Sequence, residues 1–222
     1  SHDQDQAKYS VTYDCDSQVV TGNTNTYRWT LDIGETTAIF YNNNYRLYSS
    51  ELAKVKAQGG DNAMIDQLPV ISGKYFPKND LQIVVGSPDK GEYIYYKQVL
   101  NSGLKYVDAL PVIEWQLTDS TKTICEYECK QAVGSVYGRT WTVWYSIELP
   151  LNYGPYILNG LPGLIMAARD SEGLFDFKAV GVENAPENAL VSVYKEDSHQ
   201  KCTRKRFLQL RSESEGINKD QL

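Results

Sequence analysis

The sequence is poor in histidine, which limits the catalytic centres it can build. It holds two histidines, His2 and His199, and His2 stands in a polar start that resembles a cut end. A Ser–His–Asp or Cys–His centre would therefore use His199, which lies in the polar stretch Asp197–Lys201 typical of an exposed loop. The sequence contains no P-loop, GxSxG, HExxH, EF-hand or GxGxxG pattern. It predicts no catalytic residue, and a hydrolase is the remote alternative.

Long apolar runs and an excess of basic residues are also missing. No stretch approaches the ~20 apolar residues that a membrane-spanning helix needs, so no membrane span is expected. Lys and Arg total 22 against 28 for Asp and Glu, a net charge of −6, which argues against nucleic-acid binding. The basic stretch Lys201–Arg211 is followed directly by Glu213 and Glu215, so we expect it to be a solvated helix face.

Cysteine is scarce but even in number: Cys15, Cys125, Cys129 and Cys202. Four cysteines are compatible with two disulfides in an exported protein. If residues 121–136 form one straight strand, Cys125 and Cys129 lie ~13 Å apart, too far to bridge. They would then pair with the other two cysteines in either order or stay free, whereas a bend at 126–128 would reopen the local pairing. No CxxC pair occurs, so neither a metal site nor a cofactor is predicted.

Tyrosine is abundant, with 17 Tyr against 5 Phe, and it favours half-buried strand faces. Alternating apolar and polar residues predict many short strands. A helix is expected from Ser49 or Ser50 to Gly59-Gly60, loops over 60–80, and a second helix from Thr203 to Leu210. The predicted strands are 7–14, 27–33, 36–41, 81–85, 92–99, 112–117, 121–136, 139–148, 157–158, 164–168, 175–182 and 190–194.

This order of elements predicts an α+β fold that is predominantly antiparallel β. The large sheet should curve into a half-barrel covered by one or two helices, similar in outline to the lipoprotein carriers. No linker or repeat is visible, so residues 1–222 are expected to form one domain with frayed ends at 1–6 and 212–222. The concave face is expected to be filled by helices or left open for a ligand.

Residues near that face, most of them aromatic, supply the candidate binding residues. On the strand from Arg139, residues Arg139 and Trp141 share one face and Trp144 lies on the other. Arg139 could anchor a ligand or serve as a structural clamp. The candidate ligand-binding residues are Trp29, Trp115, Arg139, Trp141 and Trp144.

The segment Gly160-Leu161-Pro162-Gly163-Leu164-Ile165 predicts a packed corner between strands. Pro162-Gly163 fits the central positions of a type II turn, where glycine supplies a positive φ. Leu161, Leu164 and Ile165 are expected to enter the core.

Those six residues spell GLPGLI, and the sequence resembles the bacterial GLPGLI family of the Bacteroidota. The likeness extends to Glu126–Ala132, Gly138–Tyr145, Leu149-Pro150 and Gly154-Pro155, and it covers most of residues 25–185. Leu31–Gly34 with Phe40-Tyr41 resembles the family's amino-terminal strand. Departures are Glu126 in place of Gly, Gln131 in place of a Lys-like residue, and Leu149 in place of Ile.

The resemblance implies export to the periplasm or beyond, after loss of a signal peptide. It carries no catalytic residue over, because no biochemical function is established for such proteins. We therefore expect a non-enzymatic binding protein whose curved sheet holds a lipid-like or peptide ligand. The alternative is an interaction module that holds an outer-membrane protein partner through tyrosines or a sheet edge.

Overall fold

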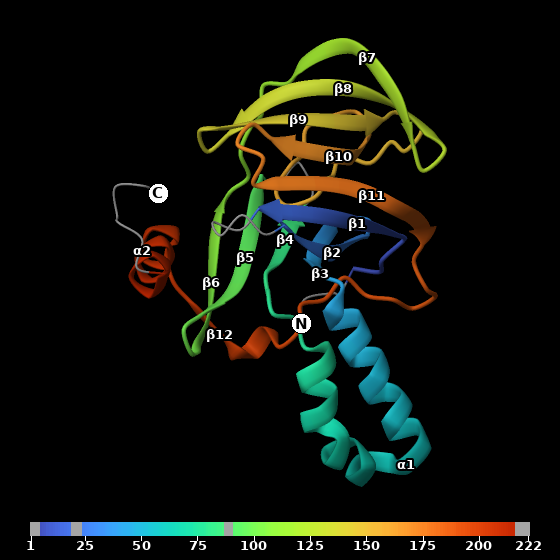
Figure 1. Ribbon diagram of the computed structural model, residues 1–222, viewed down its shortest axis with the longest axis vertical. Coiled ribbons are helices and arrows are strands. Elements are labelled where there is room, and N and C mark those ends of the chain that lie inside the picture. Colours follow the sequence, from blue (N-terminus) through green and yellow to red (C-terminus); the bar gives the residue numbers. More distant parts are fainter. Residues whose placement is uncertain (1–4, 19–23, 87–90, 216–222) are drawn as a thin grey trace.

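The computed structural model describes residues 5–18, 24–86 and 91–215, which form one large, mostly antiparallel sheet with two helices (Figure 1). The strands are β1 (Tyr9–Gln18), β2 (Thr24–Ile33), β3 (Thr37–Asn42), β4 (Gln82–Gly86), β5 (Glu92–Val99), β6 (Ser102–Ala109), β7 (Gln116–Ile124), β8 (Tyr127–Val136), β9 (Arg139–Ser146), β10 (Leu164–Asp170), β11 (Phe175–Asn184) and β12 (His199–Lys201). The helices are α1 (Asn44–Tyr75) and α2 (Arg204–Glu215), with a short 3₁₀ turn at Glu196–Ser198.

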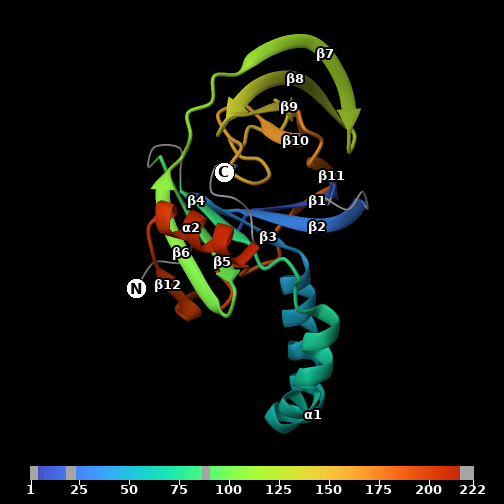
Figure 2. The ribbon, with the colours of Figure 1, turned by 60° about the vertical axis from the view of Figure 1, so that its left-hand side comes forward.

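The strand order explains why the sheet is strongly curved. The order is β12-β6-β5-β4-β3-β2-β1-β11-β10-β9-β8-β7, so the chain runs outward from β1 to β6, crosses over, and returns from β7 to β11. In a flat sheet β6 and β7 would lie about ten strand spacings, or about 48 Å, apart. The extended chain from Ala109 to Gln116 reaches at most about 25 Å. The sheet must therefore curl to bring the two ends together, and Figure 2 shows β7 and β8 arching over the rest.

Most of the predicted strands are present, with differences where the turn signals were weak. Strand β6 was not predicted, although Leu104 and Tyr106 alternate on its buried side. Residues 112–115, 157–158 and most of 190–194 lie outside the strands, and Leu190 makes an isolated bridge with Gln6.

The prediction of one long strand over residues 121–136 is wrong, because these residues form a hairpin. The turn residues Cys125 and Glu126 have φ of 49° and 69° and join β7 to β8. Two consecutive residues with positive φ form the type of two-residue hairpin turn whose twist matches the right-handed twist of the two strands it joins.

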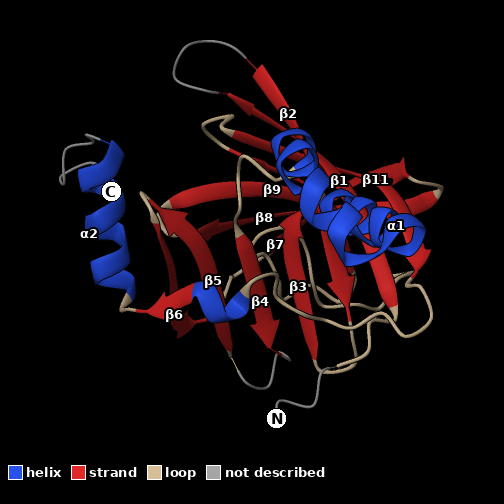
Figure 3. Cartoon of the chain, turned by 90° about the horizontal axis from the view of Figure 1, so that it is seen from below, coloured by secondary structure: helices blue, strands red, loops and turns tan. Residues whose placement is uncertain are grey.

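Helix α1 is a helical hairpin that projects away from the sheet (Figures 1 and 2), and Figure 3 shows it from below, nearly end-on in front of the sheet. Its two halves meet at Gly60, which breaks the helix with φ 73° and ψ −167°. The second half was expected to be loop, yet it is helical and contains Pro69. At its base Tyr45 stacks on Tyr194, with ring centroids 4.8 Å apart. No helix of the described residues is long and apolar enough to cross a membrane.

Helix α2 covers the inner face of β5 and β6, the face that carries the main core. Phe207 is fully buried against Tyr95 and Tyr106. The expectation of a wholly solvated basic face is wrong for Arg204, whose guanidinium lies 4.3 Å from the centre of the Tyr137 ring. The helix also extends beyond its expected end at Leu210 to Glu215, so the fraying expected from residue 212 does not include 212–215. Residues 216–222 lie outside the described residues.

The GLPGLI corner packs into the main core. Leu161, Leu164 and Ile165 are buried, which confirms their predicted placement, and the Tyr13 hydroxyl donates to the carbonyl of Ile165 at 2.7 Å. The predicted reason for Gly163 is wrong, because the left-handed glycine of the motif is Gly160, with φ 94°. Gly163 is instead needed for close approach, since a Cβ there would overlap the carbonyl oxygen of Ser146 on β9.

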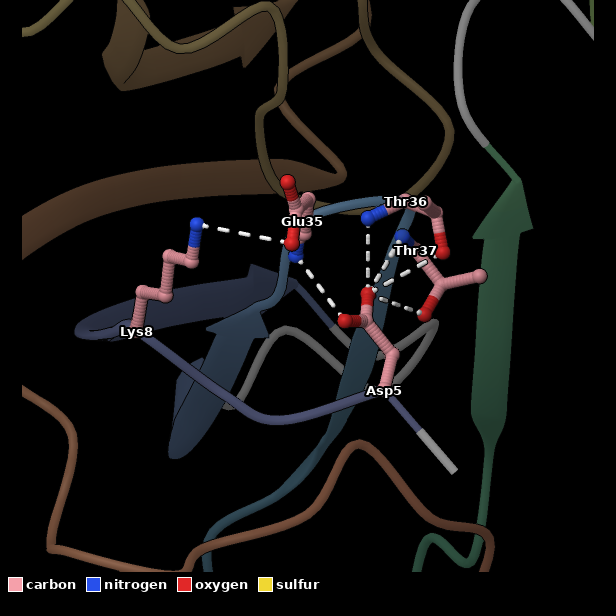
Figure 4. A network of polar contacts seen from close by, with 5 residues as sticks. All are labelled: Asp5, Lys8, Glu35, Thr36 and Thr37. Atoms are coloured by element: carbon pink, nitrogen blue, oxygen red, sulfur yellow. Dashed lines mark hydrogen bonds and ion pairs between the residues drawn. The ribbon is translucent and has the colours of Figure 1, made fainter. Parts of the chain in front are cut away.

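The amino-terminal segment is held to the sheet by Asp5 (Figure 4). Its carboxylate accepts hydrogen bonds from the backbone N–H groups of Glu35, Thr36 and Thr37 at 2.7–3.1 Å. The expected fraying of residues 1–6 therefore does not extend to Asp5 or to Gln6; residues 1–4 lie outside the described part of the chain.

Replacing Asp5 by asparagine should lower the free energy of unfolding at pH 7 by about 1–2 kcal/mol, because an amide accepts these bonds less well. Burial alone would raise the pKa of the Asp5 carboxyl, but the N–H donors of Thr36, Glu35 and Thr37 outweigh burial and lower its pKa. The stabilisation is therefore present above the ordinary pKa of about 3.9 and is lost as the pH falls through the lowered value. Urea unfolding of both proteins at pH 7 and pH 2.5 measures this. An equal difference at both pH values would contradict it.

Candidate functional site

The outer face of the sheet is partly covered and partly open. Over β1 to β4 a second, smaller core covers it, built from the buried side chains of Ala7, Ile39, Tyr41, Tyr45 and Val191. Over β9 to β11 it carries an open hollow of 460 Å³. Its lining residues are Lys122, Thr142, Trp144, Ala167, Ala168, Arg169, Asp170, Ser171 and Asp176. We call this the Trp144 hollow.

An irregularity in β10 and one small residue explain the hollow. Ile165 pairs with Tyr145, but Ala167 pairs with Trp144, so Met166 is an extra residue on β10. This bulge turns Ala167 to the outer face beside Trp144. A methyl group next to an indole leaves a depression that a larger side chain would fill. The hollow has the volume of a small-ligand site.

The far rim of the Trp144 hollow carries two opposite charges that are directly opposed across β10 and β11. Arg169 pairs in register with Asp176, yet no ion pair or hydrogen bond of the described residues engages either side chain. A guanidinium offers several N–H donors and a carboxylate offers acceptors. Both groups are therefore available to a ligand.

The near rim is Lys122 on β7, which covers the indole. Its ammonium lies 4.3 Å from the centre of the Trp144 ring. A cation–π contact at an exposed site contributes about 0.5–1 kcal/mol. Because this contact contributes so little free energy, a ligand that stacks on the Trp144 ring can displace the Lys122 ammonium.

A second open hollow of 520 Å³ lies on the same face of the sheet, beside Thr140 of β9. Val112, Glu114, Gln116, Val133, Gly134 and Ser135 complete its lining. Glu114 is exposed. This hollow has no aromatic wall, so it is the weaker candidate for a ligand.

The structure separates the five predicted binding residues, and Trp144 alone of them lines a hollow described above. Trp29 is buried and stacks on Phe40, with centroids 4.9 Å apart. Trp141 is buried against Phe175 and Phe177. The Trp115 indole N–H donates to the carbonyl of Asn159 at 2.8 Å.

Arg139 occupies the clamp position that the sequence left open as an alternative. Its Nη1 lies 3.1 Å from Oδ2 of Asp170, a carboxylate whose side chain is fully buried. Asp170 also accepts the backbone N–H of Phe175 at 2.7 Å, which closes the turn between β10 and β11. Arg139 thus positions the turn beneath the Trp144 hollow.

No cysteine lines the Trp144 hollow, and no histidine of the described residues does. All four cysteines are free thiols, which is one of the alternatives that the sequence left open, and neither of the two possible disulfides is formed. Burial raises the pKa of Cys15 to about 12 and that of Cys129 to about 11, which keeps both thiols protonated. The His199 Nδ1 lies 2.9 Å from the carbonyl oxygen of Lys195. Within the described ranges no group of three His, Cys, Asp or Glu residues could hold a metal.

Sequence reasoning missed Lys122, Ala167, Arg169 and Asp176. The alternation of β10 and β11 could have placed Arg169 and Asp176 on an outer face. Their proximity depends on strand pairing between residues that no local pattern connects.

No family model and no curated protein matches the chain. Among solved structures, it is similar to PNGF-II in two crystal forms. In the C2 form the TM-score is 0.64 at 18% identity, covering 94% of this chain and 33% of that chain. In the P21 form it is 0.62 at 17% identity, covering 94% and 34%. The chain thus spans about a third of PNGF-II, and the likeness shows the fold alone.

Proposed function

We propose that this chain is a non-enzymatic binding domain that holds a saccharide in the Trp144 hollow. The observation that carries the proposal is the juxtaposition of one indole wall, a small floor at Ala167, and the unpaired Arg169 and Asp176 on the rim. None of the nine lining residues is a histidine or cysteine. Of the two carboxylates in the lining, Asp170 is engaged by Arg139 and by the backbone N–H of Phe175. The lining therefore lacks the pair of free carboxylates that glycoside hydrolysis uses, and the arrangement supports binding better than that chemistry.

The composition of the lining favours a hydroxyl-rich ligand over a lipid. Trp144, Ala167 and Ala168 are the apolar members of the lining, and the other six residues carry hydroxyl, carboxylate, ammonium or guanidinium groups. A pyranose ring presents a C–H face that can pack on the indole and hydroxyl groups that can pair with Arg169 and Asp176. An acyl chain would leave these polar groups without partners.

This proposal moves the ligand from the inner face, where the sequence placed it, to the outer face. A half-barrel carrier would need open space beside Trp29 and Trp141, whose rings instead pack on phenylalanines. The outer face over β9 to β11 offers that space.

We also propose that the chain is an exported member of the GLPGLI group. The support is the motif itself: Gly163 and the three buried aliphatic residues of the corner have structural reasons to be where they are. Periplasmic or secreted localisation follows from the resemblance, and fractionation of cells that express the full-length protein tests it.

A role as an interaction module is the second candidate. It is favoured by the match to PNGF-II, in which a similar fold covers about a third of a longer chain. In that role, saccharide binding would attach a longer protein that contains this domain to a substrate or surface that carries the saccharide.

Methyl glycosides of glucose, galactose and mannose test the saccharide site. The chain has four Trp, so its indole N–H signals can be followed by NMR, with Trp144→Phe assigning one of them. At least one glycoside should shift the Trp144 signal saturably, and Arg169→Gln should weaken that binding at least tenfold, the loss of a charged hydrogen bond.

Arg28→Gln is the matched control, because Arg28 is an exposed arginine of the same sheet that pairs with Asp14 at 2.8 Å. It should leave the affinity unchanged. The proposal is wrong if no glycoside shifts the Trp144 signal, or if Arg28→Gln weakens binding as much as Arg169→Gln.

A further inference from the structure

The two hollows of the outer face adjoin each other. Val133 on β8, which lines the second hollow, is paired in register with Thr142 on β9, which lines the Trp144 hollow. The backbone N–H of Ser171, in the lining of the Trp144 hollow, donates to the carbonyl of Thr140, in the lining of the second hollow, at 2.8 Å. Partners in a β-ladder lie side by side on one face of the sheet, so the two linings are continuous. We call their joined surface the outer trough.

One row of paired residues runs across the outer trough. Figure 1 shows β7 to β11 side by side, and their register aligns Asp176, Arg169, Thr142, Val133 and Gln116. Each of the five residues lines one of the two hollows. Four spacings between neighbouring strands amount to about 19 Å. The row is therefore longer than a single sugar ring, and a linear ligand can lie along it.

The second hollow supplies groups that can pair with hydroxyls. Its lining includes the carboxylate of Glu114, the amide of Gln116 and the hydroxyls of Ser135 and Thr140, and all four residues are exposed. Neither Glu114 nor Gln116 makes a side-chain ion pair or hydrogen bond within the described part of the chain. Val112, which is 94% exposed, adds an apolar surface for the C–H groups of a sugar. These are the groups that further units of a saccharide would need.

The outer trough offers side chains to a ligand, not main-chain partners. Strands β8, β9, β10 and β11 each pair with a strand on both sides, so their backbone N–H and C=O groups are engaged within the sheet. An extended peptide is commonly held by main-chain hydrogen bonds to a free sheet edge, which these four strands do not present. Linked sugars bind through side-chain hydrogen bonds and through the faces of their rings, and this surface provides both.

We propose that the outer trough binds a linear oligosaccharide, with one sugar unit on Trp144 and the following units over Thr142 and the second hollow. The inference rests on the proposed function and specifies its ligand class. Once the first unit is held on the indole, the linked units meet the second hollow at a high effective concentration. A hollow without an aromatic wall thus adds affinity as an extension of the Trp144 hollow.

Linear trisaccharides test the length of the site. Maltotriose, cellotriose and the β-linked galactotriose and mannotriose extend the three methyl glycosides, and each can be titrated against the Trp144 indole signal. At least one trisaccharide should bind about tenfold or more tightly than its methyl glycoside, beyond the about threefold gain that three equivalent units would give at a single-ring site. The double variant Glu114→Ala/Gln116→Ala should weaken trisaccharide binding about fivefold and leave the affinity for the methyl glycoside unchanged.

Glu92→Ala/Gln98→Ala is the matched control, because both residues are exposed on β5 of the same sheet and line neither hollow. It should bind the trisaccharide like the unchanged protein. The inference alone is overturned if a methyl glycoside binds but no trisaccharide exceeds the gain of three equivalent units. It is also overturned if Glu114→Ala/Gln116→Ala weakens both ligands equally, or weakens the trisaccharide no more than the control does. If no methyl glycoside shifts the Trp144 signal, the proposed function fails and this inference fails with it.

Discussion

Replacing Gly163 by alanine should destabilise the protein by about 3 kcal/mol or more, among the largest losses expected for a single added methyl group. The new Cβ would overlap the carbonyl oxygen of Ser146 and press on the backbone nitrogen of Ile147. These atoms belong to the end of β9 and cannot rotate away as a side chain can. Relief would require β9 and the GLPGLI corner to separate, which would disturb the burial of Leu164 and Ile165.

Gly181→Ala on β11 is the control, because no atom lies within 4 Å of a Cβ at that position. It should change stability by less than about 1 kcal/mol, since the alanine is unstrained and lowers the entropy of the unfolded chain. Urea unfolding followed by tryptophan fluorescence measures both variants. Equal midpoints for Gly163→Ala and the unchanged protein would show that the corner is not tightly packed against β9.

The sequence predicted the kind of fold better than its turns. Alternation was enough for most strands, because residues that face the core must recur every second position. The β7–β8 turn was missed because Cys125 and Glu126 carry none of the usual Gly, Asn or Asp signals. The second half of α1 was missed because Pro69 argues against a helix interior, yet Pro69 lies on an exposed arm where a missing hydrogen bond can be replaced by water.

The candidate site was harder to predict from the sequence than the fold, for a different reason. Alternation placed Trp141 and Trp144 on opposite faces of β9, but it could not say which face is open. That depends on partners far along the chain: Phe177 covers Trp141, whereas Ala167 beside Trp144 covers very little. The hollow therefore results from the pairing of the strands. The bulge at Met166 determines that Ala167 is the residue of β10 that lies beside Trp144.

The two tryptophans of β9 provide a direct test of this difference. Trp141→Ala should lower the free energy of unfolding by about 3–5 kcal/mol, the usual cost of removing a large buried aromatic side chain. Trp141 is 3% exposed, and its ring lies 6.4 Å from that of Phe177 and 6.5 Å from that of Phe175. The cavity left behind lies between neighbouring strands that are fixed by their own pairing, so it can close only in part.

Trp144→Ala should cost far less, because the side chain is half-exposed on the outer face. The loss comprises the cation–π contact with Lys122 at 4.3 Å, about 0.5–1 kcal/mol, and part of the indole's contact with the sheet. Urea unfolding of both variants, followed by circular dichroism so that the lost fluorophore does not matter, compares them directly. If Trp144→Ala destabilised as strongly as Trp141→Ala, the outer indole would be a core residue, and its assignment to a binding site would be wrong.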